Sequence, residues 1–192
     1  MNLVLVTAPG IEPVTLAEAK EWLSVSHNLH DGMIGRLITA ARIDCEKDTQ
    51  RAFIRQKWRL TADEFETDGF VLPRPRLIEI SSLTYYDADD EQQTFDLDGL
   101  WIDSNSEPAR VQLATGSSWP TTSGRPGGVQ IEYYAGYGDG AGSVPDTARQ
   151  AILHLVAHWY EHREAVIAGT IVAVMPKTIQ SMLDDHRIWH QW

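Results

Sequence analysis

Apolar residues near the beginning of the chain recur at helical spacing. Thr15 and Glu18 form a capping box, in which the hydroxyl and the carboxylate satisfy the first free N–H groups of a helix. This motif predicts a first helix from Thr15 to about Val25, after an extended arm over residues 1–15. Asp31 is the expected N-cap of a longer second helix. The core-facing stripe of that helix consists of Ile34, Leu37, Ile38, Ala41 and Cys45.

The pattern changes to a period of two from about Ile54. There Trp58, Leu60 and Ala62 alternate with polar residues, which is typical of a half-buried strand. Short strands separated by turn residues are predicted beyond it, at 70–72, 77–80, 83–87, 93–97, 100–102, 110–113 and 129–134. The region has neither an internal repeat nor the alternating helices of a parallel sheet, so it is predicted to consist of antiparallel hairpins.

Helical spacing returns at Pro145, which suits the first turn of a long helix. Gly169 is expected near its end, and Pro176 opens a last short helix. The chain is therefore predicted to be α+β, a helical body of two N-terminal and two C-terminal helices with an inserted antiparallel β region. Its parts are the arm and first helices at 1–53, the β insertion at 54–135 and the C-terminal helices and tail at 136–192, in one composite domain.

Charge and length narrow the classes of function. The 192 residues suit one domain, and the net charge of -11 with only 16 Lys and Arg argues against phosphate binding as the main activity. The single cysteine, Cys45, is expected in the core of a protein made in a reducing cytosol. We expect no signal peptide, because the N-terminus has neither a basic region nor an adequate apolar run. No window is long enough for a membrane span.

One motif could bind a metal. His154, His158 and His162 recur every four residues along the predicted long helix, with Glu161 beside them. Two such imidazoles can bind one zinc ion, with the glutamate as general base, and this gives the alternative of a zinc-dependent hydrolase using His158, Glu161 and His162. The third ligand would have to be Glu164, Asp184 or Asp185. The other interpretation is that these histidines border a buried Trp159 face, and it predicts neither metal nor cofactor.

Two polar segments are better explained as turns than as ligand loops. The acidic run Asp87 to Glu91 resembles the start of a calcium loop, yet Gln92 stands where an EF-hand needs glycine. We interpret it as a solvated hairpin tip. The glycine-rich stretch 136–142 lacks the Lys-Ser/Thr pair of a phosphate loop and carries Asp139, so it is expected to be a corner between strand and helix. Charge reversals at tips 87–91 and 124–128 should affect assembly rather than folding.

The end of the sequence is rich in large apolar residues. Ile188, Trp189 and Trp192 lie within five positions, beyond the last predicted helix. Either they fold back onto the core or another chain holds them, since a large aromatic side chain is an effective interface anchor.

Six motifs in order support a family resemblance. They are Pro13-Val14-Thr15-Leu16-Ala17-Glu18-Ala19-Lys20, Ile34-x-x-Leu37-Ile38-x-Ala40-Ala41, Gln56-x-Trp58-x-Leu60, Leu72-Pro73-Arg74-Pro75, Ala135-Gly136-Tyr137-Gly138 and His158-Trp159-Tyr160-Glu161-x-Arg163-Glu164. Their order and spacing, from about residue 12 to residue 189, resemble the head-tail connector (adaptor) proteins of long-tailed bacteriophages, prophages and gene transfer agents. No single motif is catalytic. The family pattern often has Asn where this chain has His162, which argues against a zinc site.

The resemblance implies a structural virion protein without an active site, metal or cofactor. Such proteins form a ring, commonly dodecameric, beneath the portal protein, where they extend the DNA channel and receive a tail-side stopper or tail terminator protein. It further implies assembly in the host bacterial cytoplasm, a place at the head-tail interface, no membrane, and DNA that passes without specific binding. Ile188, Trp189 and Trp192 are then candidates for docking to the portal.

Overall fold

The computed structural model describes residues 1–162 and 175–188, and the chain divides into two compact units. The β unit contains Met1–Gly10 and Arg55–Gly138. The helical unit contains Ile11–Ile54 and the described residues from Asp139 onward. Helices and antiparallel sheets thus occupy separate stretches of sequence, which confirms the predicted α+β class.

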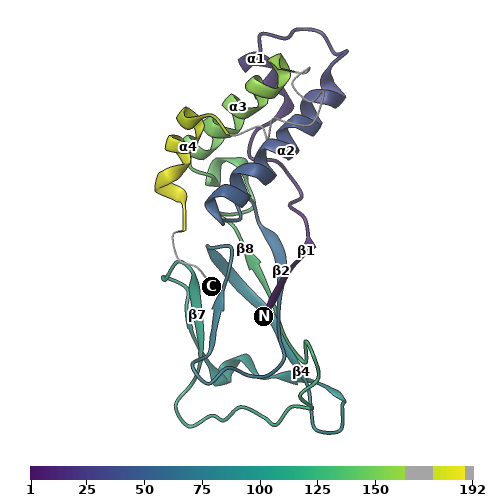
Figure 1. Ribbon diagram of the computed structural model, residues 1–192, viewed down its shortest axis with the longest axis vertical. Helices are drawn as coiled ribbons and strands as arrows, with labels where there is room; N and C mark the ends of the chain where they lie inside the picture. Colours follow the sequence, from purple (N-terminus) through teal and green to yellow (C-terminus); the bar gives the residue numbers. More distant parts are fainter. Residues whose placement is uncertain (163–174, 189–192) are drawn as a thin grey trace. The chain divides into compact units, whose positions relative to one another are not determined.

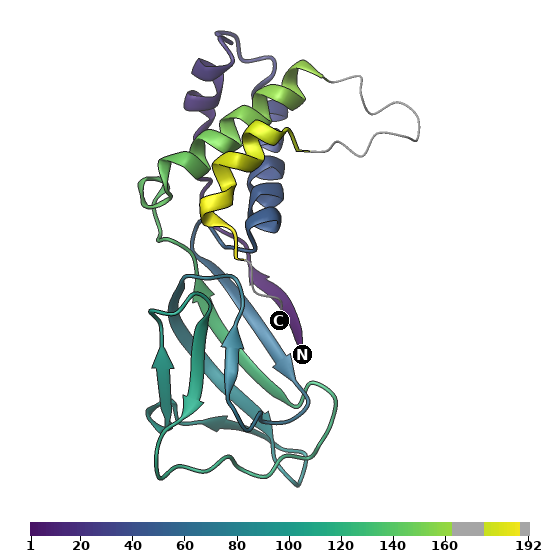
Figure 2. The same cartoon turned by 60° about the vertical axis from the view of Figure 1, so that its left-hand side comes forward.

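The helical unit is built from α1 (Leu16–Trp22), α2 (Asp31–Thr49), α3 (Asp146–Glu161) and α4 (Lys177–Leu183), with short 3-10 turns at Ala141–Ser143 and Asp184–His186. Helix α3 packs on both α2 and α4, and Figure 2 shows α4 lying alongside α3. The buried apolar side chains that form this core include Ile34, Ile38, Ala41, Cys45, Ile152, Leu155, Val156, Ile179 and Leu183. Among the described residues, no helix combines the length and the apolar character needed to cross a bilayer.

Helix starts follow the sequence signals in part. Thr15 is the N-cap of α1 and forms both hydrogen bonds of the capping box with Glu18, as predicted. The prediction of Asp31 as an N-cap is wrong, because His30 occupies that position and Asp31 is the first helical residue. The first intrahelical hydrogen bond runs from the Ile34 N–H to the His30 carbonyl oxygen at 2.9 Å, and the Asp31 carboxylate forms a 2.7 Å salt bridge with Lys20.

The β unit holds two antiparallel sheets (Figure 1). The five-stranded sheet has the order β1-β2-β8-β4-β5, with β1 at Asn2–Thr7, β2 at Gln56–Ala62, β8 at Val129–Ala135, β4 at Leu77–Tyr86 and β5 at Gln92–Phe95. The three-stranded sheet has the order β3-β7-β6, with β3 at Phe70–Leu72, β7 at Ala109–Leu113 and β6 at Leu100–Asp103. A 3-10 turn at Leu97–Gly99 connects β5 to β6. Strands predicted from period-two alternation are therefore present.

Two strand predictions need correction. The expected N-terminal arm contains a strand, β1, which pairs with β2 through partners such as Leu3 and Leu60. The two strands predicted at 77–80 and 83–87 are one strand, β4. Irregularities in the pairing of β4 with β8 lie between Ile80 and Ser82 and just after Leu77. A bulge adds a residue to one strand without ending the ladder of hydrogen bonds. The strand therefore continues through the polar residues that separate the two apolar runs.

Alternate positions of β8 form the centre of the β core. Val129, Ile131, Tyr133 and Ala135 are buried, and the residues between them are half-buried. The Tyr133 hydroxyl donates a 2.7 Å hydrogen bond to the carbonyl oxygen of Pro73, which satisfies its polar end inside the core. Burial raises the pKa of this phenol well above its usual range, so it stays protonated at any physiological pH.

Candidate functional site

The histidine stripe on α3 separates into two environments. The His154 ring lies edge-on against the Trp22 ring of α1, with centroids 5.1 Å apart. The His158 and His162 rings face each other at 4.7 Å, and His162 Nδ1 donates a 2.9 Å hydrogen bond to the His158 carbonyl oxygen. Of the three histidines, the structure thus brings only His158 and His162 together, next to an exposed Glu161.

A zinc ion at this pair would need another protein ligand. Within residues 1–162 and 175–188, no group of three or more His, Cys, Asp or Glu side chains is arranged to hold a metal ion. Asp184 and Asp185 belong to the 3-10 turn after α4, where Asp184 pairs with Arg187 at 3.2 Å. Glu164 lies outside the described residues. Among the suggested positions that the structure describes, the geometry therefore supplies two imidazoles and no third ligand.

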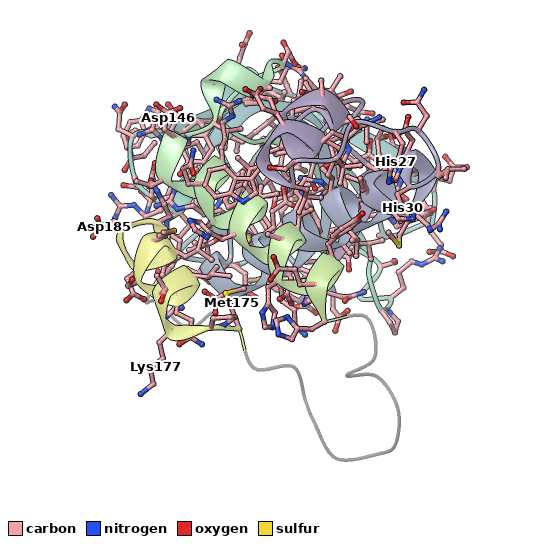
Figure 3. The ribbon with its side chains drawn as sticks, turned by 90° about the horizontal axis from the view of Figure 1, so that it is seen from above. His27, His30, Asp146, Met175, Lys177 and Asp185 are labelled. Carbon is pink, nitrogen blue, oxygen red and sulfur yellow. The ribbon has the colours of Figure 1, made fainter. Side chains whose placement is uncertain are left out.

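A second histidine contact was not predicted from the sequence. His27 and His30 belong to the connection between α1 and α2, and Figure 3 shows them on the same side of the helical unit. Their rings are 4.7 Å apart, and His30 Nδ1 is 2.6 Å from the Tyr160 hydroxyl of α3. The contact ties the connection to α3, and it joins residues 130 positions apart, so no local pattern could signal it.

The acidic tip 87–91 is a tight, internally hydrogen-bonded turn. The Asp87 carboxylate accepts hydrogen bonds from the backbone N–H groups of Asp89 and Glu91 and from the Gln93 side chain. The Glu91 backbone and then the Gln93 amide lower the pKa of Asp87, so this side chain stays ionised. Asp87 therefore shapes the turn between β4 and β5, and we expect it to contribute to folding more than the other acidic residues of this tip.

The acidic tip is also joined to the loop before β8. Asp90 forms a 3.1 Å salt bridge with Arg125, whose guanidinium lies 4.1 Å from the centroid of the Tyr86 ring. The Ser123 N–H donates a hydrogen bond to the Tyr86 carbonyl oxygen. The two segments 87–91 and 123–128 thus form one polar surface of the β unit, which we call the acidic tip surface.

We predict that Asp89→Lys and Glu91→Lys leave the melting temperature nearly unchanged, because both side chains are exposed and substitutions at such positions are usually neutral. Asp87→Lys should lower it clearly, because it removes the acceptor of three hydrogen bonds. Thermal unfolding followed by circular dichroism checks both. Equal losses for all three variants would contradict the distinction.

The glycine-rich corner is shaped by backbone geometry. Gly136 and Gly138 have φ values of 142° and 155°, and the Gly138 carbonyl accepts a 2.9 Å hydrogen bond from the Arg55 N–H. Gly136 N–H donates to the Arg76 carbonyl oxygen. These contacts support the interpretation as a corner at the end of β8.

The residues before the C-terminal tryptophans are fixed on α2. Arg187 bridges Asp48 at 2.6 Å, and Ile188 N–H donates a 3.1 Å hydrogen bond to the Thr49 carbonyl oxygen. Arg51 Nε donates to the His186 carbonyl oxygen. Of the three candidate anchors, Ile188 is half-buried at this contact, and Trp189 and Trp192 lie outside the described residues.

Comparisons with known proteins add a family and a fold. The family model of the head completion protein matches residues 12–189. A chain from the neck of an empty gene transfer agent (GTA) particle, determined with C6 symmetry, is 23% identical with a TM-score of 0.80, over 100% of this chain and 98% of the other. Chains from the virion of a native GTA particle and from a native neck with C12 symmetry are 22% and 23% identical, with the same coverage and TM-scores of 0.79 and 0.76. Among curated proteins, none is significantly similar.

Proposed function

This chain belongs to the head completion protein family of phage-like particles, and we propose that it is the head-tail connector (adaptor) subunit that forms a ring beneath the portal. It is a structural protein of the virion and not an enzyme. The observation that carries the proposal is the match of the family model across residues 12–189, together with a fold shared over the whole chain with a GTA neck protein.

The proposed ring is a dodecamer. The solved necks that contain chains of this fold were determined with C6 and C12 symmetry, which supports a closed ring with a multiple of six positions. A cyclic ring repeats one contact between neighbouring copies, so each subunit needs two different surfaces that fit each other. In this role the ring would assemble in the cytoplasm of the host bacterium.

We further propose that the ring extends the DNA channel without binding DNA specifically. The chain carries a net charge of -11, and many of its basic side chains are already paired with carboxylates. The paired residues are Lys20, Arg42, Arg55, Lys57, Arg59, Arg76, Arg110, Arg125, Arg149 and Arg187. A cation that binds a phosphate would add a salt-dependent hold on the moving duplex, and the pairing of these described residues with carboxylates reduces that attraction.

The proposed partners are the portal protein on the head side and a stopper or tail terminator protein on the tail side. Ile188, Trp189 and Trp192 are the proposed portal anchor. The support is that Arg187 and Ile188 are held on α2 by their contacts with Asp48 and Thr49. Trp189 is the next residue in the sequence. A ring presents this contact many times, and effective concentration then converts a modest anchor into a strong one. The acidic tip surface is a second candidate contact in assembly.

The test is a deletion of residues 189–192 that keeps Ile188, because its N–H bonds to Thr49. We expect a soluble, folded subunit that no longer joins portal-containing heads, measured by cosedimentation with heads and by counting tailed particles. The control is Leu29→Ala, which removes another exposed apolar side chain, 88% accessible, and should leave attachment intact.

Two outcomes would contradict parts of the proposal. If the truncated chain still completes heads, the C-terminal residues are not the anchor, although the connector role stands. If the full-length chain neither binds heads nor appears in purified particles, the connector role itself is wrong.

A further inference from the structure

Strand β1 forms an apolar edge of the β unit that no strand among the described residues covers. It is an outer strand of the five-stranded sheet, and its pairing with β2 is regular from Asn2 to Leu5. Val4, Leu5 and Val6 are 46%, 41% and 40% exposed, and no residue of β1 is charged. Edge strands of soluble proteins are usually protected by charges or proline, because their free N–H and C=O groups can pair with another chain. An unprotected edge of this kind indicates a strand-pairing surface.

Strand β6 provides a second apolar edge. It is an outer strand of the three-stranded sheet, and within the described residues it pairs with β7. Trp101 and Ile102 are 58% and 42% exposed, beside a hollow of about 470 Å³. The hollow is lined by Leu100, Trp101, Ile102, Asp103, Arg110 and Gln112. An exposed tryptophan next to a hollow is typical of an interface anchor.

The two edges are placed for contact between neighbouring copies. In Figures 1 and 2, β1 and the sheet that contains β7 lie on opposite sides of the β unit. A head-to-tail contact needs two different surfaces that point away from each other on one subunit. A contact of identical surfaces would instead close a dimer after one step.

Charge favours a second copy as the occupant of these edges. With a net charge of -11, two copies repel each other at long range and can approach best where neither presents a free carboxylate. Residues 2–7 and 100–102 contain no ionisable side chain. The carboxylate that borders the second edge, Asp103, is neutralised by a 2.8 Å salt bridge to Arg110. Both edges thus avoid the repulsion that most of the surface would generate.

We propose that β1 of one subunit adds to the free edge of β6 in the next subunit of the ring. The added strand satisfies its backbone groups on β6, and its apolar side chains cover Trp101 and Ile102. Main-chain hydrogen bonds supply affinity in such strand additions, and the side chains supply the fit. The inference rests on the proposed ring and names the contact that closes it.

Cross-linking tests whether β1 of one subunit contacts the β6 edge, and not the β1 edge, of the next subunit. Cys45 is buried, which raises the pKa of its thiol to about 12, so the wild type should react little with maleimides. We expect a short bis-maleimide to link a Thr7→Cys or Asn2→Cys subunit to a Gln112→Cys subunit in mixed rings. Gln112 is exposed beside the hollow, so this change keeps Trp101 and Ile102 in place. Linked pairs in rings of the β1 variant alone, or no linked pairs in mixed rings, would overturn the inference.

Charge insertion tests the energy of the contact. Val4→Glu with Val6→Glu should keep the circular dichroism spectrum and melting temperature, and should weaken ring formation by about tenfold or more, because the added carboxylates would enter an apolar contact. The matched control is Val71→Glu on the outer strand β3, which is 39% exposed and faces Arg110 across the ladder. Native mass spectrometry measures the rings.

The outcomes distinguish a failure of the proposed strand contact from a failure of the proposed connector role. If the wild type and the double variant form rings equally well, the strand contact is wrong and the connector role stands. If the wild type forms no ring either alone or on heads, the proposed function and this inference fail together.

Discussion

Arg42→Ala is expected to destabilise the helical unit by about 3 kcal/mol, because the change breaks a buried ionic network by removing one side of it. The Arg42 side chain is only 6% exposed, and its guanidinium forms 2.7 Å salt bridges with both Glu12 and Glu46. Glu46 also accepts a 2.7 Å hydrogen bond from the Phe53 N–H. The network thus joins the segment before α1, which contains Glu12, and the segment after α2, which contains Phe53, to Arg42 and Glu46 of α2.

The physical reason for a large effect is the charge that stays behind. Without Arg42, the carboxylates of Glu46, which is 9% exposed, and of Glu12 both lose their salt bridge to this guanidinium. Removing one partner from a buried ion pair costs several times more than a surface ion pair contributes.

Urea unfolding at pH 7, followed by circular dichroism, measures this defect. The matched control is Arg36→Ala, an exposed arginine on the same helix, which should change stability by no more than about 0.5 kcal/mol. Equal effects of the two substitutions would mean that the Glu12–Arg42–Glu46 network contributes nothing specific.

Sequence patterns predicted this fold correctly where a structural feature depends on residues that are close together in the sequence. The Thr15–Glu18 capping box and the alternation along β8 depend on neighbours three and two positions apart, and both are present as predicted. The prediction of Asp31 as an N-cap used the same kind of signal and is wrong, because His30 is the N-cap and the Asp31 carboxylate pairs with Lys20, eleven positions away. A competing tertiary partner is invisible in a local pattern.

The candidate sites show even more clearly that local sequence patterns do not reveal tertiary contacts. Spacing alone suggested three histidines on one face, whereas the His154 ring contacts Trp22 and the His158 and His162 rings contact each other. The exposed edges of β1 and β6 follow from strand order, and no periodicity encodes which strand lies at the edge of a sheet. The family resemblance, by contrast, was readable because it rests on the order of many motifs, and the match over residues 12–189 confirms it.

A second large effect is expected at the long connection 114–128, which joins β7 to β8 without a helix or strand of its own. Long connections in compact units are commonly functional, and they need an anchor to stay in one conformation. Here the anchor is Trp119, whose ring stacks on Phe65 with centroids 4.5 Å apart and an angle of 10°. Phe95 and Phe70 surround it at 5.2 and 6.2 Å.

Trp119→Ala should therefore destabilise the β unit by about 3 kcal/mol, because it removes a large aromatic side chain from a packed cluster. Trp119→Phe should cost about 1 kcal/mol or less. It keeps an aromatic ring against Phe65, and it removes an indole N–H that is buried without a hydrogen-bond partner among the described residues. The difference between the two variants isolates the stacked ring from the polar group.

The matched control is Trp101→Ala in the same unit, since Trp101 is 58% exposed and its loss should change subunit stability by no more than about 0.5 kcal/mol. Urea unfolding measures the three stabilities, and amide hydrogen exchange in β4 and β8 assigns the loss to the β unit. If Trp119→Ala costs no more than Trp101→Ala, the aromatic cluster does not hold the connection. If Trp119→Phe costs as much as Trp119→Ala, the contribution comes from the indole and not from stacking on Phe65.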